Sequence, residues 1–153
     1  STRSAQSLGS QIEAIVRTIH RPTLITTSHF RKPETVMVAF DGSATGHKTL
    51  QMLASSPLCE GLPIHIVMVG TDSEDNQNAL EKARTTLASS GSLVHSEIRP
   101  GEVESTLHAY QAEHGIDLLV MGAYGHSRIR QFLIGSTTTT MLRTSTVPLL
   151  LLR

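Results

Sequence analysis

The chain has 153 residues, enough for one domain with a sizeable core. Its 13 basic residues balance its 13 acidic residues, so no net charge favours binding to nucleic acid or to an acidic membrane. Cys59 is the single cysteine, which excludes an internal disulfide framework and suits a reducing compartment. No apolar run approaches the roughly 20 residues of a membrane span, and no hydrophobic signal core precedes the domain. We therefore expect a cytoplasmic protein with neither a nucleic-acid nor a membrane partner.

The N-terminal segment combines a helical pattern with a short strand pattern. A capping box at Ser10-Gln11-Ile12-Glu13 predicts a helix over about Gln11–His20. Thr23–Thr27 has the composition of a strand, and the polar linker His29–Glu34 follows it. These elements precede a more regular part of the chain.

From Thr35 onwards, strand and helix patterns alternate to the end of the sequence. The predicted strands are short and apolar, and span Thr35–Phe40, Pro63–Val69, Leu93–Ile98, Asp117–Met121 and Pro148–Leu152. The predicted helices are Ala44–Ala54, a helix capped by Asp72 or Ser73, Glu102–Glu113 and Ser136–Thr144. Such alternation implies right-handed crossovers, and therefore an α/β fold with an open parallel sheet and helices on both faces.

Residues that follow three of these strands carry the functional prediction. Folds of this kind bind ligands beyond the carboxyl ends of their strands, near the point where the strand order reverses. Asp41, Val69 and the loop that starts at Gly122 all follow strands. We therefore expect them to converge on one site.

The segment GAYGHSRIRQFLIGSTTTTML, which starts at Gly122, has the features of a phosphate cradle. Gly122 and Gly125 let another group approach the backbone because they lack a Cβ. After nine residues, Gly135 and Ser136 open a helix whose first N–H groups have no internal partner. Each feature also has a simpler explanation, since a turn favours glycine, Ser136 can be an ordinary N-cap and Asp41 an ordinary loop cap. The joint pattern is more specific than its parts.

That joint pattern resembles the ATP-binding branch of the universal stress protein superfamily. Its members carry Gly-x2-Gly-x9-Gly-Ser/Thr before the last helix and strand, matched here by Gly122, Gly125, Gly135 and Ser136. The family also has an acidic residue after its first strand, which Asp41 matches. The resemblance covers Thr35–Arg153. It implies a five-stranded parallel sheet in the order 3-2-1-4-5, of the Rossmann-like, adenine nucleotide alpha hydrolase-like type.

The resemblance also implies an ATP site, with magnesium as a possible companion of the phosphates. Carried over position by position, Ala39, Phe40 and Asp41 would border the adenosine, and Val69 would contact adenine. The remaining residues would lie beside the ribose and phosphates: Met121, Gly122, Tyr124, Gly125, Gly135, Ser136, Thr137 and Thr138. Asp41 could bind the ribose hydroxyls or a phosphate-bound Mg²⁺, and the sequence does not decide between them.

The N-terminal segment repeats the C-terminal one at an offset of 126 residues. Six of seventeen aligned positions are identical: Gly9, Ser10, Arg17, Thr18, Pro22 and Leu24 match Gly135, Ser136, Arg143, Thr144, Pro148 and Leu150. We interpret residues 1–32 as the closing helix and strand of a preceding domain, and residues 33–153 as a universal stress domain. The alternative is two helix-then-strand segments of similar composition.

Family dimers, and the halves of tandem members, associate through their last strands. The resemblance therefore predicts that Thr23–Thr27 pairs antiparallel with Val147–Leu152 and covers an edge that would otherwise be exposed. Either a homodimer or an intramolecular pseudo-dimer would use these strands.

Three functions are compatible with the sequence. The first is a regulatory, stress-response module that binds ATP and hydrolyses it slowly at most, because no general base other than Asp41 or His126 is evident near the phosphates. The second is a nucleotide-free structural dimerisation domain. The third is an adenylating or phosphotransfer enzyme, which the loop Asp41–Lys48 disfavours because it lacks the Ser-Gly-Gly-x-Asp-Ser and Gly-x4-Gly-Lys-Ser/Thr patterns.

Overall fold

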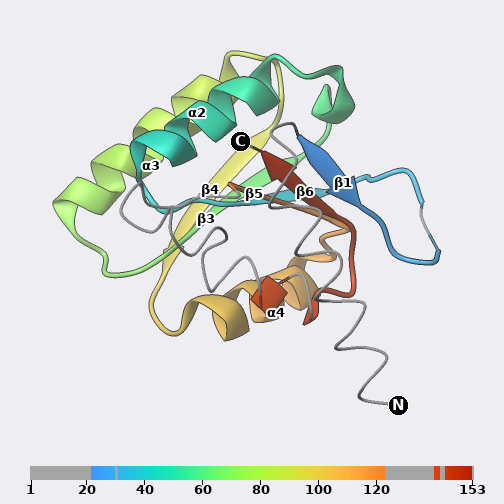
Figure 1. Cartoon of the computed structure of the whole chain (residues 1–153). Coiled ribbons are helices and arrows are strands. Elements are labelled where there is room, and N and C mark those ends of the chain that lie inside the picture. Colours follow the sequence, from blue (N-terminus) through green and yellow to red (C-terminus); the bar gives the residue numbers. More distant parts are fainter. Residues whose placement is uncertain (1–21, 30, 123–139, 142–143, 153) are drawn as a thin grey trace, which may run out of the picture.

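The computed structural model describes residues 22–29, 31–122, 140–141 and 144–152. Within these residues, the strands form one six-stranded sheet in the order β1-β6-β5-β2-β3-β4 (Figure 1). The strands are β1 (Thr23–Ile25), β2 (Val36–Ala39), β3 (Ile64–Val69), β4 (Val94–Arg99), β5 (Leu118–Gly122) and β6 (Leu149–Leu152). The helices are α2 (Ala44–Ala54), the short 3-10 helix η1 (Pro57–Cys59), α3 (Glu74–Ala88) and α4 (Val103–His114).

The five strands from β2 to β6 run parallel to one another. Counted from β2, their spatial order is 3-2-1-4-5, which confirms the predicted topology. The order reverses between β2 and β5, because the chain first builds outwards from β2 through β3 to β4 and then returns to the other side of β2.

Helices cover both faces of the sheet. Figure 1 shows α2 and α3 side by side on one face and α4 on the other. Serine N-caps start α2 and α3. Ser43 accepts a hydrogen bond from Gly46 N, and Ser73 accepts one from Asn76 N. Gly115 ends α4 with φ +60°, the left-handed conformation that glycine adopts without strain.

The buried side chains form one apolar cluster on each face, because successive residues of a strand point to opposite sides of the sheet. The cluster under α2 and α3 is centred on Val36, Val38, Leu50, Ile66 and Val120. The cluster under α4 includes Met37, Val67, Leu107, Tyr110 and Met121. The sheet therefore has no solvent-facing apolar side over its central strands.

β1 lies at one edge of the sheet and pairs antiparallel with β6, as the resemblance predicted. Thr23 is opposite Leu151, Leu24 opposite Leu150 and Ile25 opposite Leu149. The observed strand is shorter than the predicted Thr23–Thr27. The pairing covers the outer edge of β6, whose four leucines are all buried.

The sequence prediction of α2, Ala44–Ala54, matches the observed bounds. The bounds of most other elements differ from the predicted ones by one residue at one or both ends, and η1 was not predicted. The predicted helix Gln11–His20 lies outside the described residues. Of the predicted helix Ser136–Thr144, the described Thr140, Met141 and Thr144 are helical. Among the described helices, none is both long enough and apolar enough to cross a membrane.

Candidate functional site at the carboxyl edge of the sheet

Three strand ends come together where the strand order reverses. β2 lies between β3 and β5, with Ala39 opposite Val67 and Val38 opposite Val120. The last residues of these strands, Ala39, Val69 and Gly122, therefore lie along one edge of the sheet. This is the place predicted for the site.

The strand ends present side chains to both faces. Ala39 and Val69 are partly buried and pack with the buried Met121 against the cluster under α4. Phe40 is 3% exposed and belongs to the opposite cluster, under α2 and α3. The structure thus brings together the side chains of Ala39, Val69 and Met121, but not that of Phe40, because residue 40 points to the other side of the sheet from residue 39.

Asp41 organises the turn that opens α2. Its Oδ1 accepts hydrogen bonds from the backbone N–H of Ser43 (3.0 Å) and from the Ser43 hydroxyl (2.6 Å). The Ser43 hydroxyl oxygen in turn accepts from Gly46 N at 3.0 Å. Asp41 is exposed and therefore both shapes the loop and presents a carboxylate at the edge of the sheet.

Gly46 allows α2 to lie close to the end of β2. A Cβ on Gly46 would stand 2.9 Å from Asp41 Oδ1, closer than a real Cβ sits, and 3.1 Å from the Phe40 ring, a tight contact. A Cβ on Gly122 would stand 3.4 Å from the hydroxyl oxygen of Thr49, at ordinary contact distance; Thr49 is 3% exposed and donates to Thr45 O. Neither Gly46 nor Thr49 was among the predicted site residues, and only the approach of α2 identifies them.

His47 is a further titratable group beside Asp41. Its ring lies 4.9 Å from the Phe40 ring in an edge-on contact. Burial and the positive charge of Lys82 hold the pKa of His47 below its ordinary value, and Asp41 opposes that shift. The sequence signal was its position in α2, six residues after Asp41.

The remaining predicted contacts, Tyr124, Gly125, Gly135, Ser136, Thr137 and Thr138, lie outside the described residues. Within the described residues, no group of three or more His, Cys, Asp or Glu side chains could hold a metal ion.

The family of the chain follows from its sequence. The model of the universal stress protein family matches residues 70–153, which include β5, the glycine motif and β6. The chain belongs to the universal stress protein family. The match starts at Gly70, so β2 and Asp41 lie outside it.

Individual universal stress proteins are similar to almost the whole of this chain. A universal stress protein of Synechocystis is 43% identical over 148 residues, which are 95% of this chain and 52% of that protein. A universal stress protein from Archaeoglobus fulgidus has the same fold, with a TM-score of 0.72 at 23% identity over 92% of this chain and 52% of its own. A structure described as a universal stress protein in complex with cAMP gives a TM-score of 0.68 at 21% identity, over 80% of this chain and 98% of its own. This chain spans about half the length of the first two relatives.

Proposed function

We propose that this chain is a nucleotide-binding regulatory module of the universal stress type, with ATP as its ligand and slow hydrolysis at most. The nucleotide would bind at the carboxyl edge, with adenine near Ala39 and Val69. The observation that carries the proposal is that β5 ends at Gly122, the first residue of the glycine motif, beside the ends of β2 and β3. The motif therefore begins at the position where folds of this type bind ligands.

The chemistry of the edge supports an adenine nucleotide. Partly buried apolar side chains at Ala39 and Val69 suit a purine ring, and the start of α2 and the exposed Asp41 supply polar groups beside them. One fold relative is described as a complex with cAMP, which shares the adenosine and a phosphate with ATP. ATP and cAMP are therefore both candidate ligands of this site.

Equilibrium binding measured by isothermal titration calorimetry tests the proposal. ATP, cAMP and GTP are titrated into the wild-type chain and into Gly122→Val, which places a branched side chain at the end of β5, next to Thr49. Ala54→Val, a change of similar size at the far end of α2, is the matched control. We expect Gly122→Val to lose at least about tenfold in ATP affinity, or about 1.4 kcal/mol, while the control retains wild-type affinity.

The same titrations separate the alternatives. Tighter binding of cAMP than of ATP would change the ligand but keep the site. Equal and measurable ATP binding by wild type and Gly122→Val would contradict the site, and no binding of any nucleotide would favour a structural dimerisation domain. Rapid ATP turnover would favour an enzyme instead.

Asp41 gives the proposal a magnesium test. If its carboxylate binds a phosphate-bound Mg²⁺, Asp41→Asn should weaken ATP binding in magnesium and change it little in EDTA. Glu60→Gln, an exposed carboxylate at the C-cap of η1, is the control. An equal loss with and without magnesium would assign Asp41 to the ribose.

We further propose that residues 1–32 are the closing part of a preceding domain and that the two halves form a pseudo-dimer. Leu24 and Leu150 occupy equivalent positions in the 126-residue repeat, and they also face each other at the centre of the β1–β6 pair. A two-fold axis through an antiparallel pair relates each strand to the other in this way. The relative described with cAMP covers only 80% of this chain, whereas the longer relatives cover more than 90%.

Native mass spectrometry tests this assembly and the bound nucleotide together. Because β1 already occupies the edge of β6, we expect the chain to be mainly monomeric at micromolar concentration. A stable dimer of the full chain, which contains residues 1–32, would contradict the pseudo-dimer. Removal of residues 1–32 should produce dimers, because it exposes the edge of β6.

A further inference from the structure

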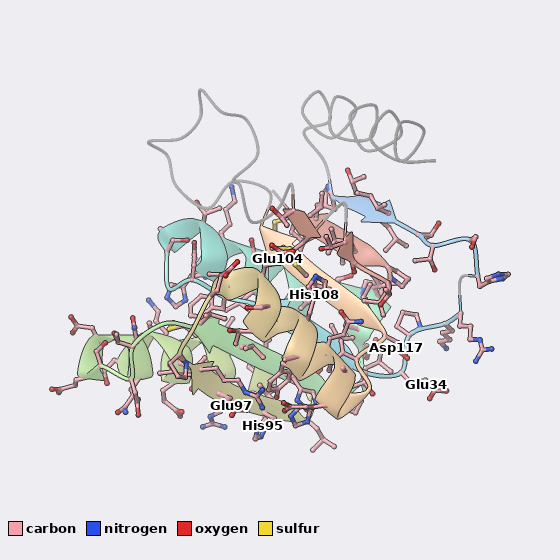
Figure 2. The ribbon with its side chains drawn as sticks, turned by 90° about the horizontal axis from the view of Figure 1, so that it is seen from below. Glu34, His95, Glu97, Glu104, His108 and Asp117 are labelled. Carbon is pink, nitrogen blue, oxygen red and sulfur yellow. The ribbon has the colours of Figure 1, made fainter. Side chains whose placement is uncertain are left out.

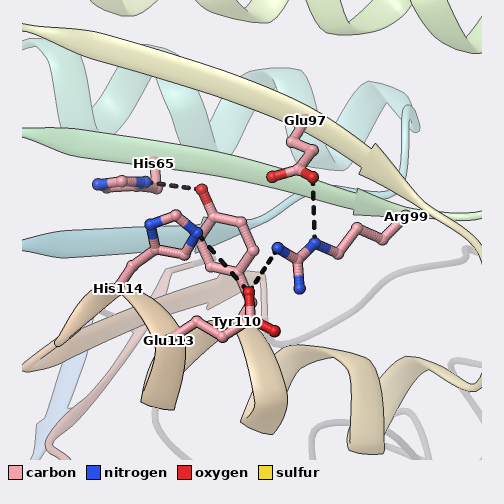
Figure 3. A network of polar contacts seen from close by, with 6 residues as sticks. All are labelled: His65, Glu97, Arg99, Tyr110, Glu113 and His114. Carbon is pink, nitrogen blue, oxygen red and sulfur yellow. Dashed lines mark hydrogen bonds and ion pairs between the residues drawn. The ribbon is translucent and has the colours of Figure 1, made fainter.

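A network of histidines, acids and a buried tyrosine joins α4 to the outer strands β3 and β4. Tyr110 lies at its centre and is 0% exposed (Figure 3). We call it the His–Tyr network. Its members are His65 on β3, His95, Glu97 and Arg99 on β4, and Tyr110, Glu113 and His114 on α4. His65 and His95 lie near the starts of β3 and β4, whereas Arg99 ends β4 opposite Val69 of the candidate nucleotide site. The network has no role in the proposed function.

Two imidazole rings, those of His65 and His114, contact the phenol, and the ring of His95 lies beside His65. His65 Nδ1 lies 2.7 Å from the Tyr110 hydroxyl oxygen. The His114 ring stacks on the Tyr110 ring, with centroids 4.1 Å apart and planes inclined by 24°. The His65 ring is 5.1 Å from that of His114 and 5.5 Å from that of His95, which is opposite it on the neighbouring strand.

Arg99 and two glutamates complete the network on the other side of the phenol. The Arg99 guanidinium lies over the Tyr110 ring, 4.6 Å from its centroid. Arg99 donates to Glu97 at 3.2 Å along β4 and to Glu113 at 2.7 Å across to α4. Figure 2, viewed from the α4 side, shows His95 and Glu97 close together at the edge of the sheet.

We propose that the His–Tyr network is a proton-operated latch, which holds α4 against the sheet at neutral pH and releases it when the histidines take up protons. Every link in it joins α4 to β3 or β4, or positions a group that does so. The groups that face His65 are His95 and Glu97 on β4, and Tyr110 and His114 on α4. Arg99 and Glu113 lie beside Tyr110.

Hydrogen bonding gives the first reason for release. Burial raises the pKa of Tyr110 to about 12, so its hydroxyl keeps its proton and can donate it to neutral His65. A protonated imidazole carries hydrogen on both nitrogens and accepts no hydrogen bond. The phenol proton must then find another acceptor in a buried site, which costs free energy.

Burial of charge gives the second reason. A proton on His65 places a positive charge in a partly buried site, which disfavours the protonated ring. The pKa of His65 is lowered mainly by burial. The nearby His114 and His95 lower it further, and the carboxylate of Glu97 partly opposes the shift. A histidine with a lowered folded pKa binds its proton more readily in the unfolded state, so its stabilising contribution is complete above its ordinary pKa of about 6.5. The contribution declines as the pH falls below that value, and the decline stops below the folded pKa.

The release of α4 would also reach the candidate site, because Leu107 and Tyr110 share a cluster with Ala39, Val69 and Met121. That consequence rests on the proposed function, whereas the latch itself does not. The latch is therefore tested without nucleotide.

Hydrogen exchange with mass spectrometry, corrected for the intrinsic pH dependence of exchange, measures the opening of each helix. Wild type is compared with His65→Gln, in which an uncharged side chain can still contact Tyr110. His108→Gln, on the same helix but bonded to Thr144 at 2.8 Å, is the matched control (Figure 2). From about pH 7.5 to about pH 5.5, α4 of wild type should lose protection relative to α3, by up to about tenfold for each unit by which the pKa of His65 is lowered.

We expect His108→Gln to behave as wild type and His65→Gln to lose most of this pH dependence. Equal loss of protection in α3 and α4 would overturn the latch. It would assign the acid effect to the whole fold, to which His47 on α2 also contributes. An unchanged pH response in His65→Gln would overturn it too.

A direct titration keeps the proposal testable if His65→Gln folds poorly. Nuclear magnetic resonance of the imidazole protons of wild type should give His65 a pKa below its ordinary value. Tyr110→Phe removes only the hydroxyl, and with it a hydrogen bond that favours the neutral ring, so it should raise that pKa. A wild-type value at or above the ordinary one, or no change in Tyr110→Phe, would overturn the proposal.

Discussion

The carboxylate of Asp117 accepts the backbone N–H of Glu34 through both of its oxygens, at 3.0 Å each. It also accepts the N–H of Thr35 at 2.9 Å, while Asp117 N donates to Thr35 O at 3.1 Å. These contacts fix the end of the β1–β2 linker at the start of β5. The linker between β1 and β2 is therefore held by a residue that directly precedes a central strand.

Asp117→Ala should lower the free energy of unfolding by roughly 1–2 kcal/mol, because it leaves two backbone N–H groups without their charged acceptor in a partly exposed place. Urea denaturation measures the change. Asp72 is an exposed aspartate whose side chain accepts a hydrogen bond from the Gln77 side chain. Asp72→Ala should therefore change stability by no more than about 0.5 kcal/mol. A similar loss in both variants would contradict the part assigned to Asp117.

Gly46→Ala should destabilise the protein although alanine favours helices by about 1 kcal/mol over glycine. The new Cβ would press on Asp41 Oδ1 and the Phe40 ring, and such overpacking costs about 1–3 kcal/mol. Thermal unfolding gives the sign. The difference between Gln51→Ala and Gln51→Gly, at an exposed position of the same helix, measures propensity alone, and a gain in Gly46→Ala equal to that difference would rule out the close approach.

Ile25→Asp should destabilise the β1–β6 pair, since Ile25 packs against the cluster under α4, whereas the neighbouring Leu24 is 39% exposed. We expect a loss of about 1.5–3 kcal/mol and more aggregation as the edge of β6 becomes exposed. Leu24→Asp is the control and should have a smaller effect. Static light scattering and denaturation of both variants decide, and equal behaviour would mean that β1 is not packed through Ile25.

Cys59 should react slowly with thiol reagents at neutral pH. The side chain is 2% exposed, and burial raises the pKa of its thiol to about 11, so the reactive thiolate is scarce. Labelling with a chromogenic disulfide should become fast in denaturant, and in the native protein it should accelerate as the pH rises towards 11. Rapid labelling of native protein at neutral pH would contradict this burial.

Much of the fold could be predicted because it depends on patterns local in the sequence. Ser73, one of the two predicted caps, starts α3, and α2 has the predicted bounds Ala44–Ala54. Alternation of strands and helices was enough for a parallel sheet. The spatial order and the β1–β6 pairing came instead from the family resemblance and the repeat, since composition does not state which strands are neighbours.

Less of the candidate site could be predicted, because it depends on which way each side chain points. Residues 39 and 69 share a face, but Phe40 turns away and fills the opposite cluster. Nothing in the local sequence distinguishes Gly46 from other helical glycines until α2 lies against Asp41.

The sequence by itself determined the approximate positions of most strands and helices, which positions are apolar, and where the glycine motif follows a strand, because these depend on neighbours along the chain. Only the tertiary structure decided that His65, Arg99 and Tyr110 meet. Their contact requires the register of β3 with β4 and the rotation of α4 about its own axis. Both are set by packing between segments that are distant in sequence, which no local pattern records.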